Sequence, residues 1–442
     1  SAPASTAPKP GSVGGLSLTL SVGVLLSTVL TAGPARAGGY DTPMLYSARH
    51  MGMGGTAIGY VNDPSALFHN PAGLANVNRF AALGDFSLLL ARVRSTPNPA
   101  TPTARDLQSN QTVAPMFLLG AAHRLTDWLV AGLGLYPIAS AGATYEYDFF
   151  GTQLEDTTRL VFLEASPALA ANFLSNRLRI GLGYRLTYVS LERFLGDPTK
   201  DHGGLDFKLT GLNAAGFRVG AQYTIVDGIS VGAVYRHKTE TTVKNDTGYA
   251  LSEQFADVST EFVLASKLGA GVRGDFGDLG IGLDLEYLFN SQNKGYPLKG
   301  TRLMTEPGQP AMPLEVANVF EWKDEFTIRT GLEYRLLGDP ALRPLALRIG
   351  YVFDGETTNP VYPSAFGTPP GPTHVITGGA GWKLSRWQFN LAYARRFGEG
   401  DVTVADLMTP GRRTCTFCGA AGDKPYKIGV HGFYFDVSVA LD

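Results

Sequence analysis

The chain has 442 residues, of which 44% are hydrophobic and only 17% are charged. An ordinary soluble domain carries about 25% charged residues, so this composition favours one large barrel over several soluble domains. The net charge of −2 gives no electrostatic case for binding nucleic acid, and the 54 glycines would weaken helices by about 1 kcal/mol each relative to alanine.

The N-terminal part of the chain is predicted to be a secretory signal peptide. An apolar run over residues 16–32 precedes Ala35-Arg36-Ala37, and an Ala-x-Ala sequence after a short apolar run is typical of a cleavage site. We therefore expect residues 1–37 to be removed. The alternative is a transmembrane anchor, which needs about 17 apolar residues at least. After residue 37 the chain contains no run of 18 apolar residues that could form a transmembrane helix. Any membrane-spanning part must therefore be a closed barrel.

Residues 38–79 contain clusters of small residues and several glycines, without regular alternation of polar and apolar residues. If the rest of the chain closes into a wide barrel, the lumen must be filled or it conducts water. A segment of this length, entering from the periplasmic side, is suited to fold inward. We call residues 38–79 the hatch and predict that it plugs the lumen.

From about residue 80 onward, apolar residues alternate with polar residues and glycines, as in residues 178–188, 279–289 and 345–354. Side chains of a strand alternate between its two faces, so each segment has one apolar face. Many segments run about 11 to 15 residues, against about 5 to 6 for soluble strands, and aromatic residues gather near their ends. This pattern is typical of a barrel with aromatic girdles in a membrane, and it disfavours a soluble sandwich.

Fourteen such segments can be counted, and the links between them are alternately short and long. The segments lie near 80–92, 112–124, 128–138, 157–173, 178–192, 207–224, 229–242, 259–276, 279–290, 326–337, 344–354, 373–384, 387–397 and 427–441. Outer-membrane barrels have short periplasmic turns and long outer loops. The sequence therefore predicts an all-β fold, a 14-stranded antiparallel transmembrane β-barrel over residues 80–442, with the hatch in its lumen.

The hatch carries a motif that can be compared with a known family. It contains Gly52, Gly54 and Gly55, then Asp63 with Ser65 and Ala66, and then Asn70-Pro71-Ala72-Gly73. This sequence resembles the N-terminal hatch of the FadL/TodX family of outer-membrane transporters, and later hairpins around residues 211–236 and 322–351 resemble the same family. Two departures are His69, where the family usually has an aromatic residue, and the end at Asp442 without an outward-facing aromatic residue.

The resemblance implies passive transport of hydrophobic compounds, foremost long-chain fatty acids, across the outer membrane of a Gram-negative bacterium. The expected steps are capture at the outer loops, an apolar pocket in the lumen, movement of the hatch and lateral release into the bilayer. The alternative is a related barrel without transport activity, with a structural or partner-docking role. The apolar surface of the long loop 291–325 fits ligand capture, although it could equally pack on its neighbours as a lid.

The resemblance also implies a kink in the third strand, through which ligand would leave. Here the third segment contains Gly132, Gly134 and Pro137. Proline cannot donate to a strand ladder and glycine weakens one, so these residues are predicted to interrupt the wall. The alternative is that Pro137 only ends a strand at its loop.

Polar residues on the lumen face could contact a ligand carboxylate. The candidates are Arg329, Arg335 and Arg348, because arginine binds carboxylates through two parallel hydrogen bonds. Lumen carboxylates such as Glu333, Glu286 or Asp284 are competing partners.

The remaining candidate sites are few. Cys415 and Cys418 stand close together in the last long loop, without a second cysteine pair or a nearby histidine, which favours a local disulfide over a zinc site. We predict no catalytic residues, no metal site and no cofactor, so the chain is not expected to be an enzyme. Its expected partners are a hydrophobic ligand, outer-membrane lipid and lipopolysaccharide, and the expected state is a monomer.

Overall fold

The computed structural model describes residues 39–41, 44–97, 104–250, 253–303, 311–336 and 345–441, so the predicted signal peptide lies outside the described residues. Its helical elements are the helices α2 (Ala48–Met51), α3 (Ala66–His69) and α4 (Val404–Leu407) and the 3-10 helices η1 (Pro71–Asn76) and η3 (Asn290–Gln292). The strands are β1 (Phe80–Ser95), β2 (Leu107–Gln108), β3 (Thr112–Arg124), β4 (Leu129–Phe149), β5 (Thr152–Phe173), β6 (Leu178–Gly196), β7 (Leu205–Val226), β8 (Ile229–Arg236), β9 (Thr239–Ala250), β10 (Glu253–Leu264), β11 (Lys267–Phe276), β12 (Leu279–Leu288), β13 (Leu298–Arg302), β14 (Met312–Val316), β15 (Glu325–Arg335), β16 (Leu345–Asp354), β17 (Thr373–Leu384), β18 (Trp387–Gly400) and β19 (Tyr426–Leu441).

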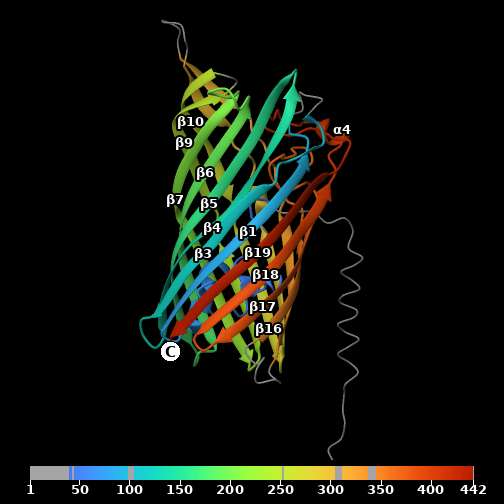
Figure 1. The fold of residues 1–442 in the computed structure, drawn as a ribbon. Helices are drawn as coiled ribbons and strands as arrows, with labels where there is room; N and C mark the ends of the chain where they lie inside the picture. The colour runs from blue at the N-terminus through green and yellow to red at the C-terminus, as the bar shows by residue number, and fades with distance from the viewer. Residues whose placement is uncertain are drawn as a thin grey trace, which may run out of the picture. The chain divides into compact units, whose positions relative to one another are not determined.

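The strands close into a ring of antiparallel neighbours (Figure 1). β1 pairs with β3 on one side and with the last strand, β19, on the other, where Phe80 lies opposite Leu441. The ring continues through β4, β5, β6, β7, β8, β11, β12, β15, β16, β17 and β18. The predicted 14-stranded barrel is therefore confirmed for the described residues.

Several strands are longer than the sequence pattern predicts. Residues 139–156 were expected to form a loop, but β4 and β5 continue as a hairpin to a turn at Phe150-Gly151. The expected strands 229–242 and 259–276 are each divided, into β8 and β9 and into β10 and β11. Beyond the membrane a strand no longer needs an apolar face, so these extensions lack the alternation on which the prediction depended.

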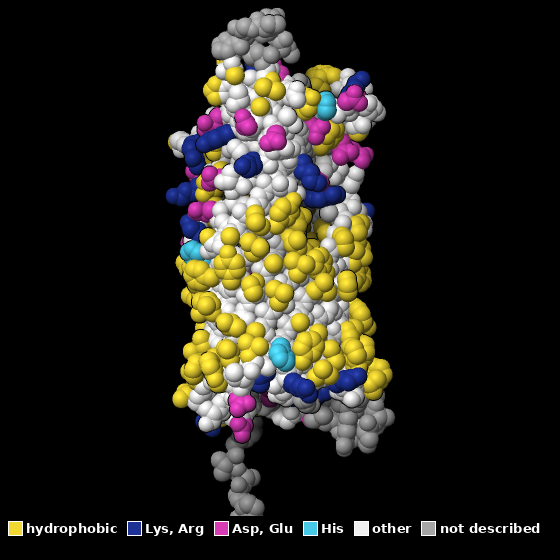
Figure 2. All heavy atoms as spheres, turned by 90° about the vertical axis from the view of Figure 1, so that its left-hand side faces the viewer, with side chains coloured by type: hydrophobic (Ala, Val, Ile, Leu, Met, Phe, Trp, Pro, Cys, Tyr) yellow, Lys and Arg dark blue, Asp and Glu magenta, His cyan; other side chains and the backbone are white. Residues whose placement is uncertain are grey.

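The outer face of the barrel carries a broad apolar belt. Figure 2 shows hydrophobic side chains gathered in this belt, with charged side chains concentrated above and below it. Exposed side chains such as Phe86, Leu133, Leu182, Leu283 and Ile349 belong to it, while Asp85, Arg185 and Asp284 on the opposite faces of their strands are buried. None of the helices within the described residues is long and apolar enough to cross a membrane.

Residues 44–79 of the hatch pack against the inner face of the barrel wall. Wall carboxylates hold the hatch backbone: the Asp85 carboxylate accepts a hydrogen bond from the Ala48 amide (3.0 Å), and Asp284 accepts two, from Ala57 (2.8 Å) and Ile58 (3.0 Å). Each buried backbone amide needs a hydrogen-bond acceptor. Because wall carboxylates are the acceptors here, these hydrogen bonds hold the hatch at a defined position in the lumen.

Inward-facing glycines of the wall let the hatch approach closely. A Cβ atom added at Gly181 would lie 2.3 Å from both the carbonyl carbon of Pro71 and the amide nitrogen of Ala72. One added at Gly350 would lie 2.1 Å from the amide nitrogen of Gly54. At these positions only glycine leaves room for the backbone of another segment. The wall glycines therefore form a seat for the hatch.

Candidate functional site

Above the hatch, toward the long outer loops, aromatic side chains surround a small pocket of about 120 Å³. We call this the aromatic pocket. Tyr40 lines it together with Trp322 and Phe262, and its ring centroid lies 4.6 Å and 5.9 Å from theirs. The ring of Phe162 lies 5.5 Å from that of Tyr40. Its further lining includes Phe207, Leu160, Leu191, Leu298, Phe320, Phe366 and Phe417. Burial of apolar surface is the main interaction that such a lining can offer to a ligand.

Among the described residues that line the aromatic pocket, the one arginine is Arg193. Its guanidinium forms an ion pair with Asp156 and lies over the Phe366 ring, 4.8 Å from the centroid. A carboxylate entering the pocket would have to compete with Asp156 for this cation.

The chain just before the hatch helices is anchored in the same region. The Asp41 carboxylate accepts two hydrogen bonds from the Arg236 guanidinium, at 2.6 and 2.5 Å, and this pair holds Tyr40 in the pocket. Burial raises the pKa of Asp41, but the Arg236 cation outweighs that effect and keeps the pKa below its usual value. Neither Tyr40 nor Asp41 was predicted, because no motif marks them in the sequence.

A larger cavity of about 670 Å³ adjoins the aromatic pocket and shares Gly39, Tyr40, Ala141, Thr158, Leu160, Gly367 and Thr368 with it. Its lining also includes Thr112 to Met116 of β3 and several residues of β4 between Pro137 and Thr144. Some of these residues face outward, since Val113 is 58% exposed. The cavity thus extends from the lumen to the barrel wall.

The wall is open where the larger cavity reaches it. β3 and β4 pair only from Arg124 opposite Val130 to Leu119 opposite Leu135. Beyond that point β3 pairs with β1 and β4 pairs with β5, but the two strands do not pair with each other. Farther out, the Asn110 amide donates to the Thr144 carbonyl (2.8 Å). We call the unpaired stretch between these two closures the window.

The three residues predicted to form a kink take different positions around the window. Pro137 stands at an irregularity, because Pro137 lies opposite Leu163 while Ala139 lies opposite Phe162, which leaves Ile138 as an extra residue. Gly132 and Gly134 face inward, where an added Cβ would lie 3.0 Å from Leu74 and Leu67 of the hatch, respectively. The carbonyl of Pro137 accepts a hydrogen bond from the Tyr46 hydroxyl (2.8 Å), which links the hatch to this strand.

The residues of the hatch motif fix the hatch backbone. Gly54 and Gly55 have φ angles of 69° and 80°, a region that favours glycine. The Asn70 side-chain amide donates to the carbonyls of Ile58 (2.8 Å) and Ala221 (3.1 Å). Asn70 also precedes η1, and its side-chain oxygen accepts from the Ala72 amide (3.1 Å). Pro71, Ala72 and Gly73 form the first turn of η1.

Comparison with known proteins assigns a family to this arrangement. Residues 28–273, more than half of the chain, match the model of the family described as outer membrane protein transport protein (OMPP1/FadL/TodX). The chain belongs to this family. It is therefore a Gram-negative outer-membrane protein, in a family of channels and transporters for hydrophobic compounds rather than of enzymes.

Solved structures show the same fold at low identity. A Pseudomonas aeruginosa FadL homologue is 15% identical, with a TM-score of 0.67, and the match covers 92% of this chain and 100% of that chain. The Pseudomonas putida toluene transporter TodX is 17% identical, with a TM-score of 0.62 and coverages of 91% and 99%. The Ralstonia pickettii toluene transporter TbuX is 14% identical, with a TM-score of 0.62 and coverages of 91% and 100%. Among curated proteins, no sequence matches the chain.

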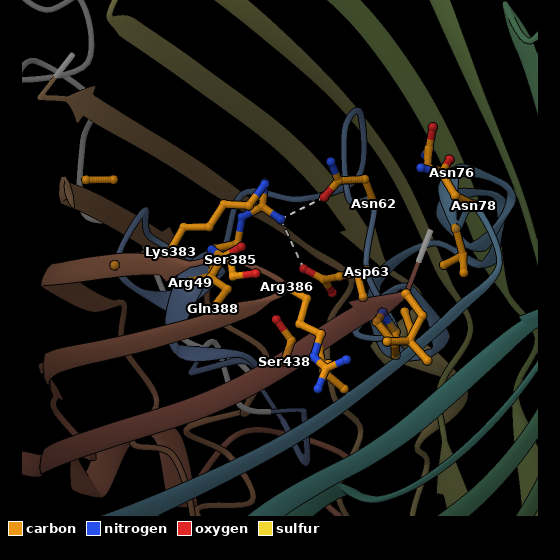
Figure 3. A pocket seen from close by; sticks show the side chains of 18 of the residues that line it. Arg49, Asn62, Asp63, Asn76, Asn78, Lys383, Ser385, Arg386, Gln388 and Ser438 are labelled. Atoms are coloured by element: carbon orange, nitrogen blue, oxygen red, sulfur yellow. Dashed lines mark hydrogen bonds and ion pairs between the residues drawn. The ribbon is translucent and has the colours of Figure 1, made fainter. Parts of the chain in front are cut away.

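In this FadL/TodX-family chain, the periplasmic end of the lumen holds a polar vestibule of about 720 Å³ between the hatch and the wall (Figure 3). Arg49 donates to Asn62 (2.7 Å) and to Asp63 (3.1 Å) there. His50 is buried beside them: its Nδ1 donates to the Thr56 carbonyl (3.0 Å), and its Nε2 lies 3.9 Å from the Asp63 carboxylate.

Acidification is expected to loosen the hatch. Burial lowers the pKa of His50 to about 4 from the ordinary value of 6.5, and the pKa of the adjoining His69 is also lowered, mainly by burial. Between pH 4 and pH 6.5, His50 is protonated in a displaced hatch but neutral in the hatch that is packed in the lumen. The packed position is therefore destabilised as the pH falls from 6.5 toward 4. The His50 shift corresponds to about 3 kcal/mol. Conductance across a planar bilayer should therefore rise in this range.

The His50→Gln variant serves as the control for that measurement. It cannot titrate at this position, so its conductance should change much less between pH 7 and pH 4.5. A wild-type conductance that stays constant over this interval, or an equal rise in the variant, would show that His50 does not cause the pH dependence.

The three predicted carboxylate-binding arginines all lie beside the hatch, among lumen acids. Arg329 donates to Glu286 (2.9 Å) and to the Gly54 carbonyl (3.3 Å). Arg348 donates to Glu333 (2.8 Å), and Arg335 donates to Asp275 (2.8 Å). None of the three lines the aromatic pocket or the larger cavity. Their ligand role stays a prediction, and their ion pairs favour a role in seating the hatch.

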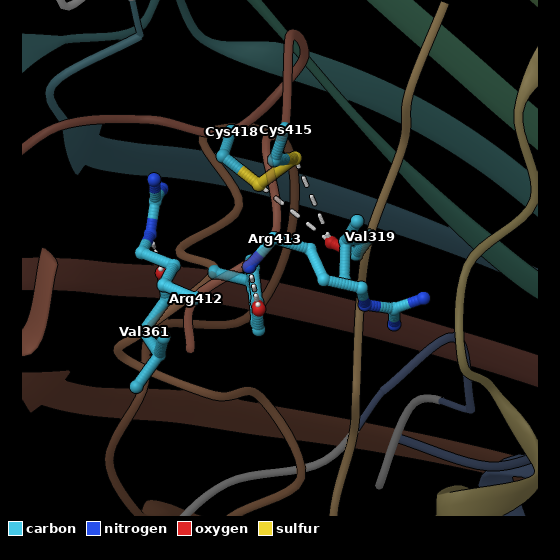
Figure 4. Close-up of a disulfide and its surroundings, with 7 residues drawn as sticks. Val319, Val361, Arg412, Arg413, Cys415 and Cys418 are labelled. Carbon is cyan, nitrogen blue, oxygen red and sulfur yellow. Dashed lines mark hydrogen bonds between the residues drawn. A yellow bond between two sulfur atoms is a disulfide. The ribbon is translucent and has the colours of Figure 1, made fainter. Parts of the chain in front are cut away.

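The outer loops are joined around a disulfide between Cys415 and Cys418, in the loop between β18 and β19 (Figure 4). Both sulfur atoms lie near the Val319 carbonyl of the β14–β15 loop, at 3.8 and 3.6 Å. Arg412 donates to the Val361 carbonyl (2.9 Å) of a third loop. The disulfide thus lies where three outer loops meet, close to Phe320 and Phe417 of the aromatic pocket.

Removing this disulfide is expected to loosen the loops and leave the barrel intact. The Cys415→Ser/Cys418→Ser variant loses a short covalent loop that contributes about 2 kcal/mol to stability. Neither cysteine lies in a strand of the barrel, so the barrel itself should stay folded. Limited proteolysis should cut residues 401–425 faster than in the wild type, while the heat-modified mobility of the barrel on gels stays the same. Unchanged cleavage would show that the noncovalent contacts alone hold the loops.

Proposed function

We propose that the protein passively transports hydrophobic compounds from the outer loops to the outer membrane, through the aromatic pocket, the larger cavity and the window. The observation that carries this proposal is the continuity of the two cavities, which share seven lining residues and reach the unpaired edges of β3 and β4. Apolar solutes dissolve readily in acyl chains, where burial contributes about 0.8 kcal/mol per CH₂ group, so the route needs no energy source.

The pocket lining favours an uncharged aromatic ligand over a long-chain fatty acid. Aromatic rings pack well against each other in edge-to-face contacts, and Tyr40 already makes such contacts with Phe262 and Trp322. The one arginine of the pocket is neutralised by Asp156, so a fatty-acid carboxylate would lack an available partner there. Three matched relatives are themselves described as transporters or channels for toluene or monoaromatic hydrocarbons. The fatty-acid prediction stays untested.

A barrel that only docks partner proteins would not need this route. Two adjoining cavities that reach unpaired strand edges of the wall stabilise nothing in a purely structural barrel, because unfilled space costs packing energy. These cavities therefore favour transport over the partner-docking alternative.

Fluorescence of Trp322 offers a test of ligand binding. Trp322 lines the aromatic pocket, whereas Trp128, Trp382 and Trp387 are exposed on the outside of the barrel. Titration of the purified protein with toluene should give a saturable change in emission that Trp322→Phe abolishes, and oleate should give a weaker change. If neither compound changes the emission and mass spectrometry finds no co-purified hydrophobic ligand, the proposal is wrong.

A further inference from the structure

A group of basic side chains stands on the outer face of the barrel where β18, β19 and β1 leave the apolar belt. Arg92 and Arg94 extend from β1, Arg395 from β18 and Lys427 from β19. Their strand neighbours Val93, Arg396 and Ile428 are buried on the lumen side, so the four cations point outward. We call these four residues the basic cradle.

The strand register brings the cations of the cradle together. Arg94 lies directly opposite Lys427, and Arg92 lies opposite Gly429, while Arg395 lies opposite His431 two residues farther along β19. Like charges placed directly opposite each other destabilise a sheet unless an anion lies between them. Glu399 pairs with Lys427 (2.6 Å) and offsets one of these charges, and an anionic ligand would offset the positive charge that remains.

The floor of the cradle is Gly429. A Cβ atom added at Gly429 would lie 3.2 Å from both terminal nitrogens of Arg395, so the guanidinium extends across the glycine toward β1. The missing side chain leaves room for this guanidinium to lie over Gly429, between β18 and β1.

Few anionic groups compete for these cations. Glu399 pairs with Lys427 (2.6 Å), and Arg92 donates to the Gln111 side chain (3.4 Å). Within the described residues, no acidic partner of Arg94 or Arg395 lies within ion-pair distance. The cradle therefore has a clear excess of positive charge.

The height of the cradle on the wall identifies its occupant. Tyr393, Phe397 and Phe433 extend from the same strands on the same face, and exposed aromatic residues of this kind mark the boundary between acyl chains and headgroups. The cradle lies on the side of the long outer loops, which face the outer leaflet. An anion at this height and on this side is a phosphate of a membrane lipid in that leaflet.

We propose that the basic cradle binds a phosphate group of lipid A, the anchor of lipopolysaccharide. Arg92 and Arg395 would donate charge-assisted hydrogen bonds to the phosphate from either side of Gly429, and Arg94 and Lys427 would add charge from the extracellular side. This site lies on the lipid face of the wall, outside the aromatic pocket and the window.

Binding of diphosphoryl lipid A to the purified full-length protein in detergent tests the proposal. Native mass spectrometry should show that Arg92→Gln/Arg395→Gln binds about a hundredfold more weakly than the wild type, since each lost charged contact costs about tenfold. The matched control is Arg159→Gln/Lys208→Gln, which removes two exposed cations that share Glu192 elsewhere on the rim. This control should bind within about twofold of the wild type.

Further arms separate a specific site from general surface charge. Gly429→Ala keeps every charge but would displace the Arg395 guanidinium from its place over the glycine, so it should also weaken binding of lipid A and leave the fold of the barrel unchanged. Monophosphoryl lipid A and phosphatidylglycerol should bind more weakly than diphosphoryl lipid A. Equal loss in the cradle and control variants, or phosphatidylglycerol binding as tightly as lipid A to the wild type, would overturn the proposal.

Discussion

Replacing Ala141 by tryptophan should abolish uptake of hydrophobic compounds while the barrel still folds. Ala141 lines both the aromatic pocket and the larger cavity, beside the free edge of β4. An indole at this position would fill the junction between the two cavities and separate the pocket from the window. Uptake of labelled toluene by cells that express the variant should fall at least about tenfold, because the indole would occupy the place where the two cavities adjoin.

Ala131→Trp is the matched control for this variant. Ala131 is on the same strand, at the position paired with Leu169 on the outer, lipid-facing side of the wall, where a tryptophan is readily accommodated. Its uptake should equal that of the wild type. Normal uptake by Ala141→Trp, with the variant present in the outer membrane at wild-type levels, would show that ligand does not pass between the two cavities.

Replacing Gly181 by alanine should unseat the hatch and open the barrel to ions. The added Cβ would lie 2.3 Å from the Pro71 carbonyl carbon and from the Ala72 amide, both of which are backbone atoms of the hatch motif. Overpacking of this kind costs about 1 to 3 kcal/mol, which corresponds to a roughly 5- to 150-fold larger open population. Single-channel recordings should show that increase as more frequent openings.

Gly183 provides a control two residues farther along the same strand and on the same inward face. A Cβ added there would lie 3.5 Å from the nearest atom, the Ser166 hydroxyl oxygen, which is an ordinary contact. Gly183→Ala should therefore keep the closed state of the wild type. Equal opening in the two variants would mean that the hatch does not depend on the close approach at Gly181.

Alternating residues predicted the barrel well because the membrane imposes one apolar face on every strand that crosses it. Leu279, Ile281 and Leu283, for example, are predicted and found on the outer face of β12. The extension of β4 beyond Pro137 was missed, because outside the membrane its outward residues, such as Ser140 and Thr144, are polar. The hatch motif was recognised in the sequence, but its glycines do not reveal which wall residues they meet.

The window could not be predicted from the sequence. Residues 113–118 of β3 are all apolar, and such a run reflects the environment of a strand rather than its hydrogen bonds. Pro137 stands at the irregularity of β4, but neither it nor the adjoining glycines indicate the position of the free edges. Tyr40 and Asp41 belong to the site only through contacts with residues far along the chain, and no local pattern marks such contacts.

We propose that hydrophobic compounds leave the lumen through the window between β3 and β4. This exit can be followed by photo-crosslinking during uptake, with an aromatic hydrocarbon that carries a diazirine and with adducts mapped by mass spectrometry. We expect adducts on the aromatic pocket, at residues such as Phe207, and on both edges of the window, at Met116 and Ala141. Adducts confined to the polar vestibule beside Arg49 and Asp63, with the window unlabelled, would contradict this route.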